Sequence, residues 1–202
     1  MNAIVGRLEP VTIAPSPLIV VTVARTLDEL MQVMAVRSLV YLGGQDCPYA
    51  EEFDGNDFAG STHLLARVGG EPSGTMRVRW FAGFAKIERA AVLPSQRGVG
   101  LSVELMNRAL RLAADKGYRR VLAHGQVQLT AHWTRSSGFR VRETRGRFVF
   151  SDHEYVELER DLDETPGAIN ENTDPLVLNR PEGEWERPGV LEASIQRGAS
   201  PC

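Results

Sequence analysis

The chain has 202 residues, of which 43% are hydrophobic and 24% are charged, so it can bury one sizeable core and is too short for a large multidomain enzyme. Its formal net charge of −3 gives no general attraction to nucleic acid. Its two cysteines, Cys47 and Cys202, are too few for a disulfide framework or a zinc cluster. We therefore expect neither a nucleic-acid partner nor a bound metal.

The sequence contains neither a membrane-spanning segment nor a signal peptide that would direct the protein out of the cytoplasm. No apolar run approaches the ~18 consecutive residues that a membrane-spanning helix needs. The N-terminus also lacks a basic segment followed by a hydrophobic stretch, the pattern of a signal peptide. The sequence thus predicts a soluble, cytoplasmic protein that makes no membrane contact.

Proline and glycine content predicts where the domain begins and ends. Residues 1–17 and 163–202 are rich in proline and read as tails, which leaves residues 18–162 as one domain. The C-terminal tail keeps apolar residues such as Trp185 and Leu191, so part of it is expected to pack on the domain or on a partner. A homodimer is one such arrangement.

The first half of the domain opens with a strand and a helix. Leu18 to Ala24 is a β-branched run that suits a buried strand, and helical spacing of apolar residues begins at Thr26. Thr26 and Glu29 have the spacing of a capping box. A long polar loop is expected from Gly43 to Ser61. Strands are expected at Thr62–Val68, Thr75–Phe81 and Lys86–Leu93.

The second half is dominated by one amphipathic helix from about Gly98 to Lys116, with Gly117 as its C-terminal stop. After it we expect a short strand at Arg120–Ala123, a helix over 128–137, and strands over 139–143 and 147–160. This order predicts an α+β fold.

The turn that enters the long helix carries the clearest chemistry. Its residues are Arg97, Gly98, Val99, Gly100, Leu101 and Ser102. Glycines at a helix N-terminus expose backbone amides and let a phosphate approach them closely. No Gly-Lys-Ser/Thr follows and three-glycine spacing is absent, so this is neither a P-loop nor a dinucleotide fingerprint. By itself such a turn is also compatible with a simple tight turn.

The same turn resembles motif A of the GNAT family of acyl-CoA N-acyltransferases, Arg/Gln-x-x-Gly-x-Gly/Ala, with Ser102 in place of the last small residue. The resemblance extends to the segment Ile87–Val92, which is similar to the fourth strand of the family, and to Gly138-Phe139 further on. It covers residues 18–161. A narrower likeness to small bacterial GNAT proteins is carried by Arg37, Gln45, Tyr49, Asp54, Asp57, His63, Gly74–Arg77, Arg89, His124–Gln126 and His153.

The resemblance implies a mixed, mostly antiparallel sheet of six to seven strands, flanked by helices, with a V-shaped cleft between strands 4 and 5. It implies acetyl-CoA as co-substrate, with its pantetheine arm along Ala90, Ala91 and Val92 and its pyrophosphate on Arg97–Ser102. An amine acceptor would attack the thioester directly, with a backbone amide near Val92 facing the oxyanion.

An attacking amine must lose a proton, so a base is required. The candidates are Glu88 on the fourth strand and His124 at the end of the fifth, with His132 as a third; His132 and His153 read more simply as structural residues. The general acid of the family is a tyrosine shortly before Gly-Phe, where this chain has Trp133 and Thr134. Three alternatives follow: the thiolate leaves without this acid, Tyr155 or a water replaces it, or the protein binds acyl-CoA without efficient turnover.

The acceptor side is predicted from two groups of charges. Glu51, Glu52, Asp54 and Asp57 form an acidic loop that reads either as an ordinary solvated loop or as an attractor of amines. Arg77 and Arg79 share one face of a strand and are candidates for binding an acceptor carboxylate. The Glu52-x-Asp54-x-x-Asp57 spacing is also similar to acyl-homoserine-lactone and N-acyl amino acid synthases. A long-chain N-acyltransferase is therefore the main alternative, beside a non-catalytic acyl-CoA-binding module.

Overall fold

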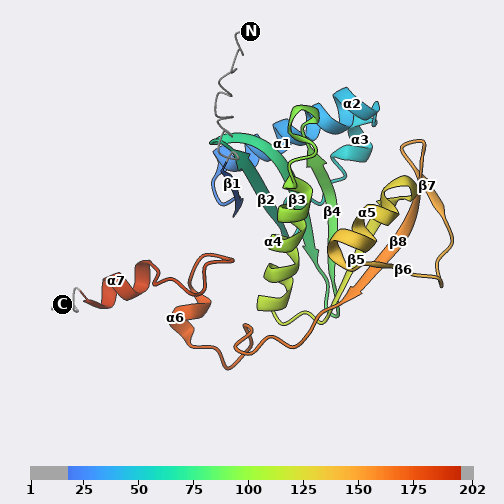
Figure 1. The fold of residues 1–202 in the computed structure, drawn as a ribbon. Coiled ribbons are helices and arrows are strands. Elements are labelled where there is room, and N and C mark those ends of the chain that lie inside the picture. Colours follow the sequence, from blue (N-terminus) through green and yellow to red (C-terminus); the bar gives the residue numbers. More distant parts are fainter. Residues whose placement is uncertain (1–17, 197–202) are drawn as a thin grey trace, which may run out of the picture.

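A computed structural model describes residues 18–196, apart from the side chain of Gln196 (Figure 1). The expected N-terminal tail, residues 1–17, and Cys202 lie outside the described residues. No helix in the described part of the chain is long and apolar enough to cross a membrane.

One mixed sheet of eight strands organises the protein, in the order β1-β2-β3-β4-β5-β8-β6, with β7 paired to β8. All neighbouring pairs are antiparallel except β4 and β5, which are parallel. The strands are β1 (Ile19–Val23), β2 (Ser61–Val68), β3 (Glu71–Trp80), β4 (Ala85–Val92), β5 (Arg120–Gln126), β6 (Arg140–Val141), β7 (Phe148–Phe150) and β8 (His153–Asp161). The fold class expected from the sequence is confirmed, with one strand more than its upper bound.

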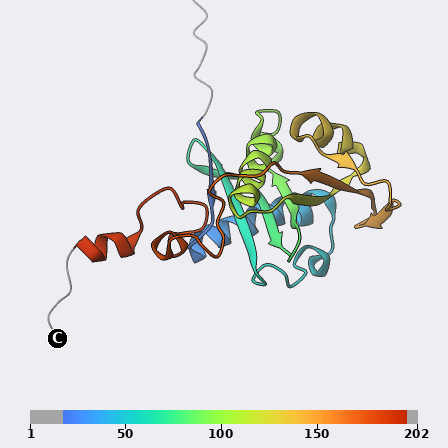
Figure 2. The same cartoon turned by 90° about the horizontal axis from the view of Figure 1, so that it is seen from below.

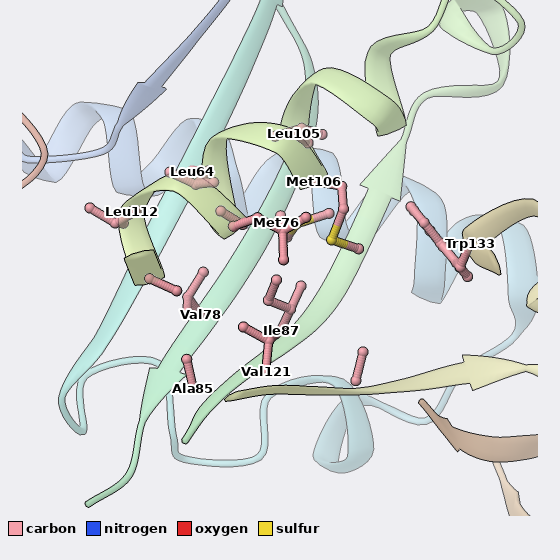
Figure 3. Packing of buried hydrophobic residues seen from close by; sticks show 14 of the residues in the cluster. Leu64, Met76, Val78, Ala85, Ile87, Leu105, Met106, Leu112, Val121 and Trp133 are labelled. Carbon is pink, nitrogen blue, oxygen red and sulfur yellow. The ribbon is translucent and has the colours of Figure 1, made fainter. Parts of the chain in front are cut away.

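Helices cover both faces of the sheet. Helix α1 (Leu27–Arg37) packs on one face, and α4 (Leu101–Asp115) with α5 (Thr130–Ser137) on the other (Figure 2). The shorter helical segments are the π-helical turn η1 (Ser38–Leu42), α2 (Gly43–Gln45), α3 (Tyr49–Glu52), η2 (Pro94–Gln96), η3 (Val127–Leu129), α6 (Pro175–Leu178) and α7 (Val190–Gln196). The main core lies between α4 and the central strands, where Leu105 and Met106 face Met76 (Figure 3).

Local sequence signals explain both long helices. The Thr26 hydroxyl accepts a hydrogen bond from the Glu29 amide at 3.1 Å, and the Glu29 carboxylate accepts one from the Thr26 amide at 3.2 Å, so the capping box is confirmed. Helix α4 buries a continuous apolar face and ends before Gly117, whose φ of +80° favours glycine.

Two expectations of the sequence analysis are wrong in detail. The polar loop from Gly43 to Ser61 contains α2 and α3, because the helix that starts at Leu27 continues through η1 into α2. The single strand expected over 147–160 is a hairpin of β7 and β8. Ser151 and Asp152 both have positive φ and make its two-residue turn.

Part of the C-terminal segment packs on the domain, which is one of the two arrangements expected from its apolar residues. The Glu182 carboxylate accepts hydrogen bonds from the Lys116 ammonium at 2.5 Å and from the Thr62 hydroxyl at 2.8 Å. Arg108 donates to the Gly183 carbonyl at 2.7 Å, and Trp185 packs against the main core. Helix α7 continues outward from this region (Figure 1).

Candidate active site

The cleft follows from the pairing of β4 and β5. These strands are paired only over Ala85–Ile87, opposite Val121–Ala123, and part beyond Ile87. A register shift against β3 bulges β4 near Arg89, which has a φ of +53°. The backbone from Glu88 to Val92 therefore faces an opening in place of a neighbouring strand. This confirms the V-shaped cleft.

The turn into α4 lines the larger of two cavities, of about 810 Å³. Gly98 and Gly100 have φ of +84° and +87°, and an added Cβ at either would meet nothing within 4 Å. Within residues 18–196, the amides of residues 98–102 have no backbone hydrogen bond. Open space, free amides and the N-terminus of a 15-residue helix together suit an anion such as a pyrophosphate.

A second cavity of about 260 Å³ adjoins the larger one and is smaller and more enclosed, and we refer to it as the deeper cavity. Its apolar wall includes Met106, Ala123, Leu129, Trp133, Phe139 and Leu158. Its polar wall includes Glu52, Asp54, Arg79, Lys86, Glu88, Arg89 and His124. Phe148 and Phe150 of β7 and Tyr155 of β8 add an aromatic side.

The two cavities meet at a junction lined in common by Gln45, Ala90, Gln126, Leu129 and Trp133. The Gln126 side-chain amide donates to Gln45 Oε1 at 3.3 Å and to the Tyr155 hydroxyl oxygen at 3.2 Å. The Tyr41 hydroxyl donates to the Ala90 carbonyl at 2.7 Å, which fixes the bulged part of β4. Groups bound in the two cavities would come into contact at this junction.

Glu88 lies in the cleft as expected, but it does not have the environment of a general base. Its carboxylate accepts a hydrogen bond from Arg77 Nε at 2.9 Å and forms ion pairs with Arg77 Nη2 at 2.7 Å and with Lys86 Nζ at 2.8 Å, and only 9% of the side chain is exposed. Burial raises the pKa of Glu88, but the hydrogen bond and charge of Lys86 and the charge of Arg77 outweigh it and hold the pKa below its usual range. A carboxylate stabilised in this way is a weak proton acceptor. Its buried structural partner is Arg77 of β3.

The predicted role of Arg77 in binding an acceptor is wrong. Its side chain is fully buried and donates to both carboxylate oxygens of Asp54, at 2.9 and 2.7 Å, as well as to Asp57 at 2.8 Å. No donor is left for a ligand carboxylate. Arg79 lies at the cavity with 23% of its side chain exposed and remains a candidate.

Both interpretations of the acidic loop also need correction. Glu52 is buried and accepts a hydrogen bond from Arg37 at 2.5 Å, and Asp57 pairs with the same arginine at 2.5 Å. Asp54 pairs with Arg77 and with Arg89. The loop is therefore neither an ordinary solvated loop nor a set of free acidic groups for an amine. Glu52, Asp54 and Asp57 belong to a largely buried charge network that positions one wall of the cleft, in which Asp54 keeps 28% of its side chain exposed.

His124, unlike Glu88, has the environment of a general base. Its imidazole is about one-third exposed, lies 3.8 Å from a Glu157 oxygen and meets the Phe148 ring edge-on. Burial, followed by the charge of Lys86, lowers its pKa, so the neutral imidazole that can accept a proton prevails at neutral pH. His132 instead lies by the Ser102 hydroxyl, at 3.4 Å.

Tyr155 lines the smaller cavity, and its hydroxyl oxygen accepts a hydrogen bond from the junction residue Gln126, so it is placed to replace the missing tyrosine. Burial raises its pKa, so it stays protonated. Trp133 lines the wall at the position where the family pattern has its acid. Sequence reasoning missed Tyr41 and the aromatic pair on β7, because their place in the cleft depends on long-range pairing. In the described part of the chain, no three His, Cys, Asp or Glu side chains come together as a metal site would require.

Comparison with known proteins agrees with this geometry. The sequence model of the Acetyltransferase (GNAT) family matches residues 30–139. The N-acetyltransferase YjcF of Bacillus subtilis (strain 168) is 30% identical over 119 residues, which cover 59% of this chain and 84% of that protein. A crystal structure of an acyl-CoA N-acyltransferase from Pseudomonas aeruginosa is similar with a TM-score of 0.63 and 28% identity, over 72% of this chain and 99% of the other.

A third similarity extends the fold comparison. FeeM, an N-acyl amino acid synthase from uncultured soil microbes, has a TM-score of 0.60 at 11% identity, over 71% of this chain and 91% of the other, a likeness in fold alone. The fold and the cleft are those of an acyl-CoA-dependent acyltransferase. The chain belongs to the GNAT acetyltransferase family.

Proposed function

We propose that this enzyme transfers an acetyl group from acetyl-CoA to an amine of a small molecule or peptide, by direct attack of the amine on the thioester. The junction between the two cavities carries this proposal, because it joins a phosphate-binding turn to a pocket that holds a neutral histidine and a tyrosine. The reaction forms an amide and releases the CoA thiol.

The residues that would hold the donor are those of the turn and of the bulged strand. The free amides of residues 98–102 and the guanidinium of Arg97 would bind the pyrophosphate. The open backbone edge from Ala90 to Val92 would pair with the pantetheine arm, and an amide near Val92 would face the oxyanion. Of these three residues, Ala90 and Val92 line the larger cavity, whereas Ala91 is buried against α1 and η1.

Proton transfer is assigned to two residues of the cleft. His124 would take the proton of the attacking amine, directly or through a water, since it is the neutral base on the polar wall. Tyr155 would donate a proton to the departing sulfur, and its place is fixed by the hydrogen bond from Gln126. Glu88 would hold the polar wall together as a permanent anion.

Cavity size favours a short acyl chain. Pockets for drug-sized ligands usually measure about 300–1,000 Å³. The deeper cavity has about 260 Å³ for the acyl group and the reacting part of the acceptor together. An acetyl group leaves room for a small acceptor, whereas a long chain would fill the space alone.

Release of thiol from a series of acyl-CoA donors, measured against a panel of amines, tests the proposal. We expect turnover with acetyl-CoA and a steep fall as the chain lengthens. Faster turnover with long-chain donors, or with acyl carrier protein thioesters, would support the long-chain alternative. Tight CoA binding without thiol release for any amine would indicate a binding module.

A further inference from the structure

Two cations lie side by side on the polar wall of the deeper cavity. Arg79 of β3 and Lys86 of β4 are direct partners in the antiparallel register, and both side chains line the cavity. They are 23% and 20% exposed, respectively. Like charges directly opposite each other destabilise a sheet unless an anion lies between them.

The carboxylate between them, that of Glu88, is already shared. It lies 2.8 Å from the Lys86 ammonium and 2.7 Å from the buried Arg77 guanidinium, but 3.9 Å from that of Arg79. Besides this contact, Arg79 lies over the Phe81 ring with its guanidinium carbon 5.0 Å from the centroid. Of the three cations, Arg79 is therefore the least neutralised.

A charge count over the whole network gives the same result. The ion pairs join five cations, Arg37, Arg77, Arg79, Lys86 and Arg89, to four carboxylates, Glu52, Asp54, Asp57 and Glu88. With the carboxylates ionised, one positive charge is left over. The cations other than Arg79 each have a carboxylate oxygen within 3.1 Å, so the excess charge lies at Arg79, at the cavity.

The register also places this charge beside the proposed base. Lys86 pairs with Leu122 and Ile87 with Ala123 across β4 and β5. Because side chains alternate along a strand, His124 shares a sheet face with Lys86 and Glu88. A ligand whose anionic group lay between Arg79 and Lys86 would therefore extend over the face that carries His124.

The β7–β8 hairpin limits how large that ligand can be. Its Ser151 hydroxyl donates to the Glu51 carboxylate of α3 at 2.5 Å, which ties the hairpin across the cleft. The Phe150 ring lies under the Arg89 guanidinium, 5.5 Å from centroid to guanidinium carbon. The hairpin thus closes one side of a cavity of about 260 Å³, which favours a free small molecule over a protein chain.

We propose that the acceptor is a small amine that carries a carboxylate, of the amino-acid type, and that Arg79 and Lys86 bind this carboxylate while the amine faces His124. The planar guanidinium of Arg79 would bind the carboxylate with two hydrogen bonds, and Lys86 would add a point charge. This inference rests on the proposed function, because it names the acceptor class of the same site.

The proposed carboxylate contact is tested in the wild-type enzyme with pairs of acceptors that differ only in this group. Each acceptor is offered as the free carboxylate and as its carboxamide, with acetyl-CoA as donor and thiol release as the readout. We expect kcat/KM to be roughly 10- to 100-fold higher for the carboxylates, the range of one charge-assisted contact. Equal values for the two forms would overturn the inference and leave the proposed function intact.

Variants locate the contact. Arg79→Gln should lower the ratio of kcat/KM for the carboxylates to kcat/KM for the carboxamides about 10-fold or more. Lys86→Gln should lower the same ratio, but it should also change the rates with both acceptor forms, because Lys86 contacts Glu88 and its charge lowers the pKa of His124. Arg187→Gln, which changes an arginine that is 79% exposed on the C-terminal segment, is the matched control and should change neither the ratio nor the rates. An equal loss for both acceptor forms in Arg79→Gln would contradict the assignment. Absence of thiol release with every amine would overturn the proposed function, and this inference with it.

Discussion

A guanidinium nitrogen of Arg77 lies 2.7 Å from a carboxylate oxygen of Glu88, and the arginine is fully buried. This ion pair fixes Glu88 as an anion at the base of the cleft. It also keeps Arg77 away from the cavity surface, so that Arg79 and Lys86, at 23% and 20% exposed, are the most accessible cations of the polar wall, ahead of Arg89 at 13%. This contact therefore separates the residues that stabilise the polar wall, Arg77 and Glu88, from those that are available to a ligand, Arg79 and Lys86.

The first prediction separates His124 from Glu88. His124→Gln should lower kcat/KM by about 10²-fold, and the loss should shrink at high pH, where the free amine is already abundant. Because burial and Lys86 lower the pKa of His124, the acidic limb of the wild-type pH profile should lie below the usual histidine range. Rates are measured from acid to alkaline pH.

Glu88→Gln provides the contrast. It should lower the free energy of unfolding, because Arg77 and Lys86 lose their shared anion, and any loss of kcat/KM should persist at high pH. A loss in Glu88→Gln that disappears at high pH, with normal stability, would return the role of base to Glu88.

The second prediction concerns Tyr155. Tyr155→Phe keeps the ring but removes the proposed proton donor, so kcat should fall by about 10²-fold with little change in CoA affinity. Gln45→Ala is a control near the same junction that keeps the phenol and should have a smaller effect. If kcat of Tyr155→Phe equals that of the wild type, Tyr155 is not the proton donor, and water protonates the thiolate.

The third prediction tests the phosphate-binding turn. Gly100→Val should weaken CoA binding by about 10-fold or more in calorimetry, because its side chain would occupy the space in front of the free amides. Gly70→Val is a matched control: Gly70 has a similar φ, +95° against +87°, and also lies in open space, but in the β2–β3 turn. The two variants should lose similar stability. Equal CoA affinity in both would exclude the turn as the binding site.

The fourth prediction concerns the buried network. Arg37→Met should lower the free energy of unfolding by about 3–5 kcal/mol, because it leaves Glu52 and Asp57 buried without a shared cation. Arg120→Met, at the half-exposed pair with Asp161, should have little effect. Urea unfolding of both variants measures the difference, and similar values would mean that the network contributes no more than a surface pair.

The fifth prediction concerns the C-terminal segment. A chain that ends after Asp163 should still fold cooperatively, because the sheet and its helices are complete by Asp161. It should melt at a lower temperature than the full chain, since it loses the Glu182–Lys116 ion pair and the packing of Trp185. Loss of the cooperative transition would show that the segment belongs to the core.

The features that could be predicted from the sequence are those that depend on local patterns of residues. The capping box at Thr26, helix α4 and the glycine turn each depend on residues within one or two helical turns. The register of β3 against β4 is set by the whole sheet, and it decides that Glu88 meets Arg77. The charge network could not be predicted, because its partners are up to 37 residues apart in the sequence. The strength of its ion pairs also depends on how deeply they are buried, which the sequence does not show.

Product analysis with the wild-type enzyme, acetyl-CoA and a small amino acid shows directly whether the acetyl group is transferred to an amine. The amount of released thiol and the amount of N-acetylated acceptor are measured in the same reaction by a thiol assay and mass spectrometry. We expect equal amounts of the two products and no release of thiol without acceptor. Thiol release without an acetylated amine would show hydrolysis in place of amine transfer and would contradict the proposed function.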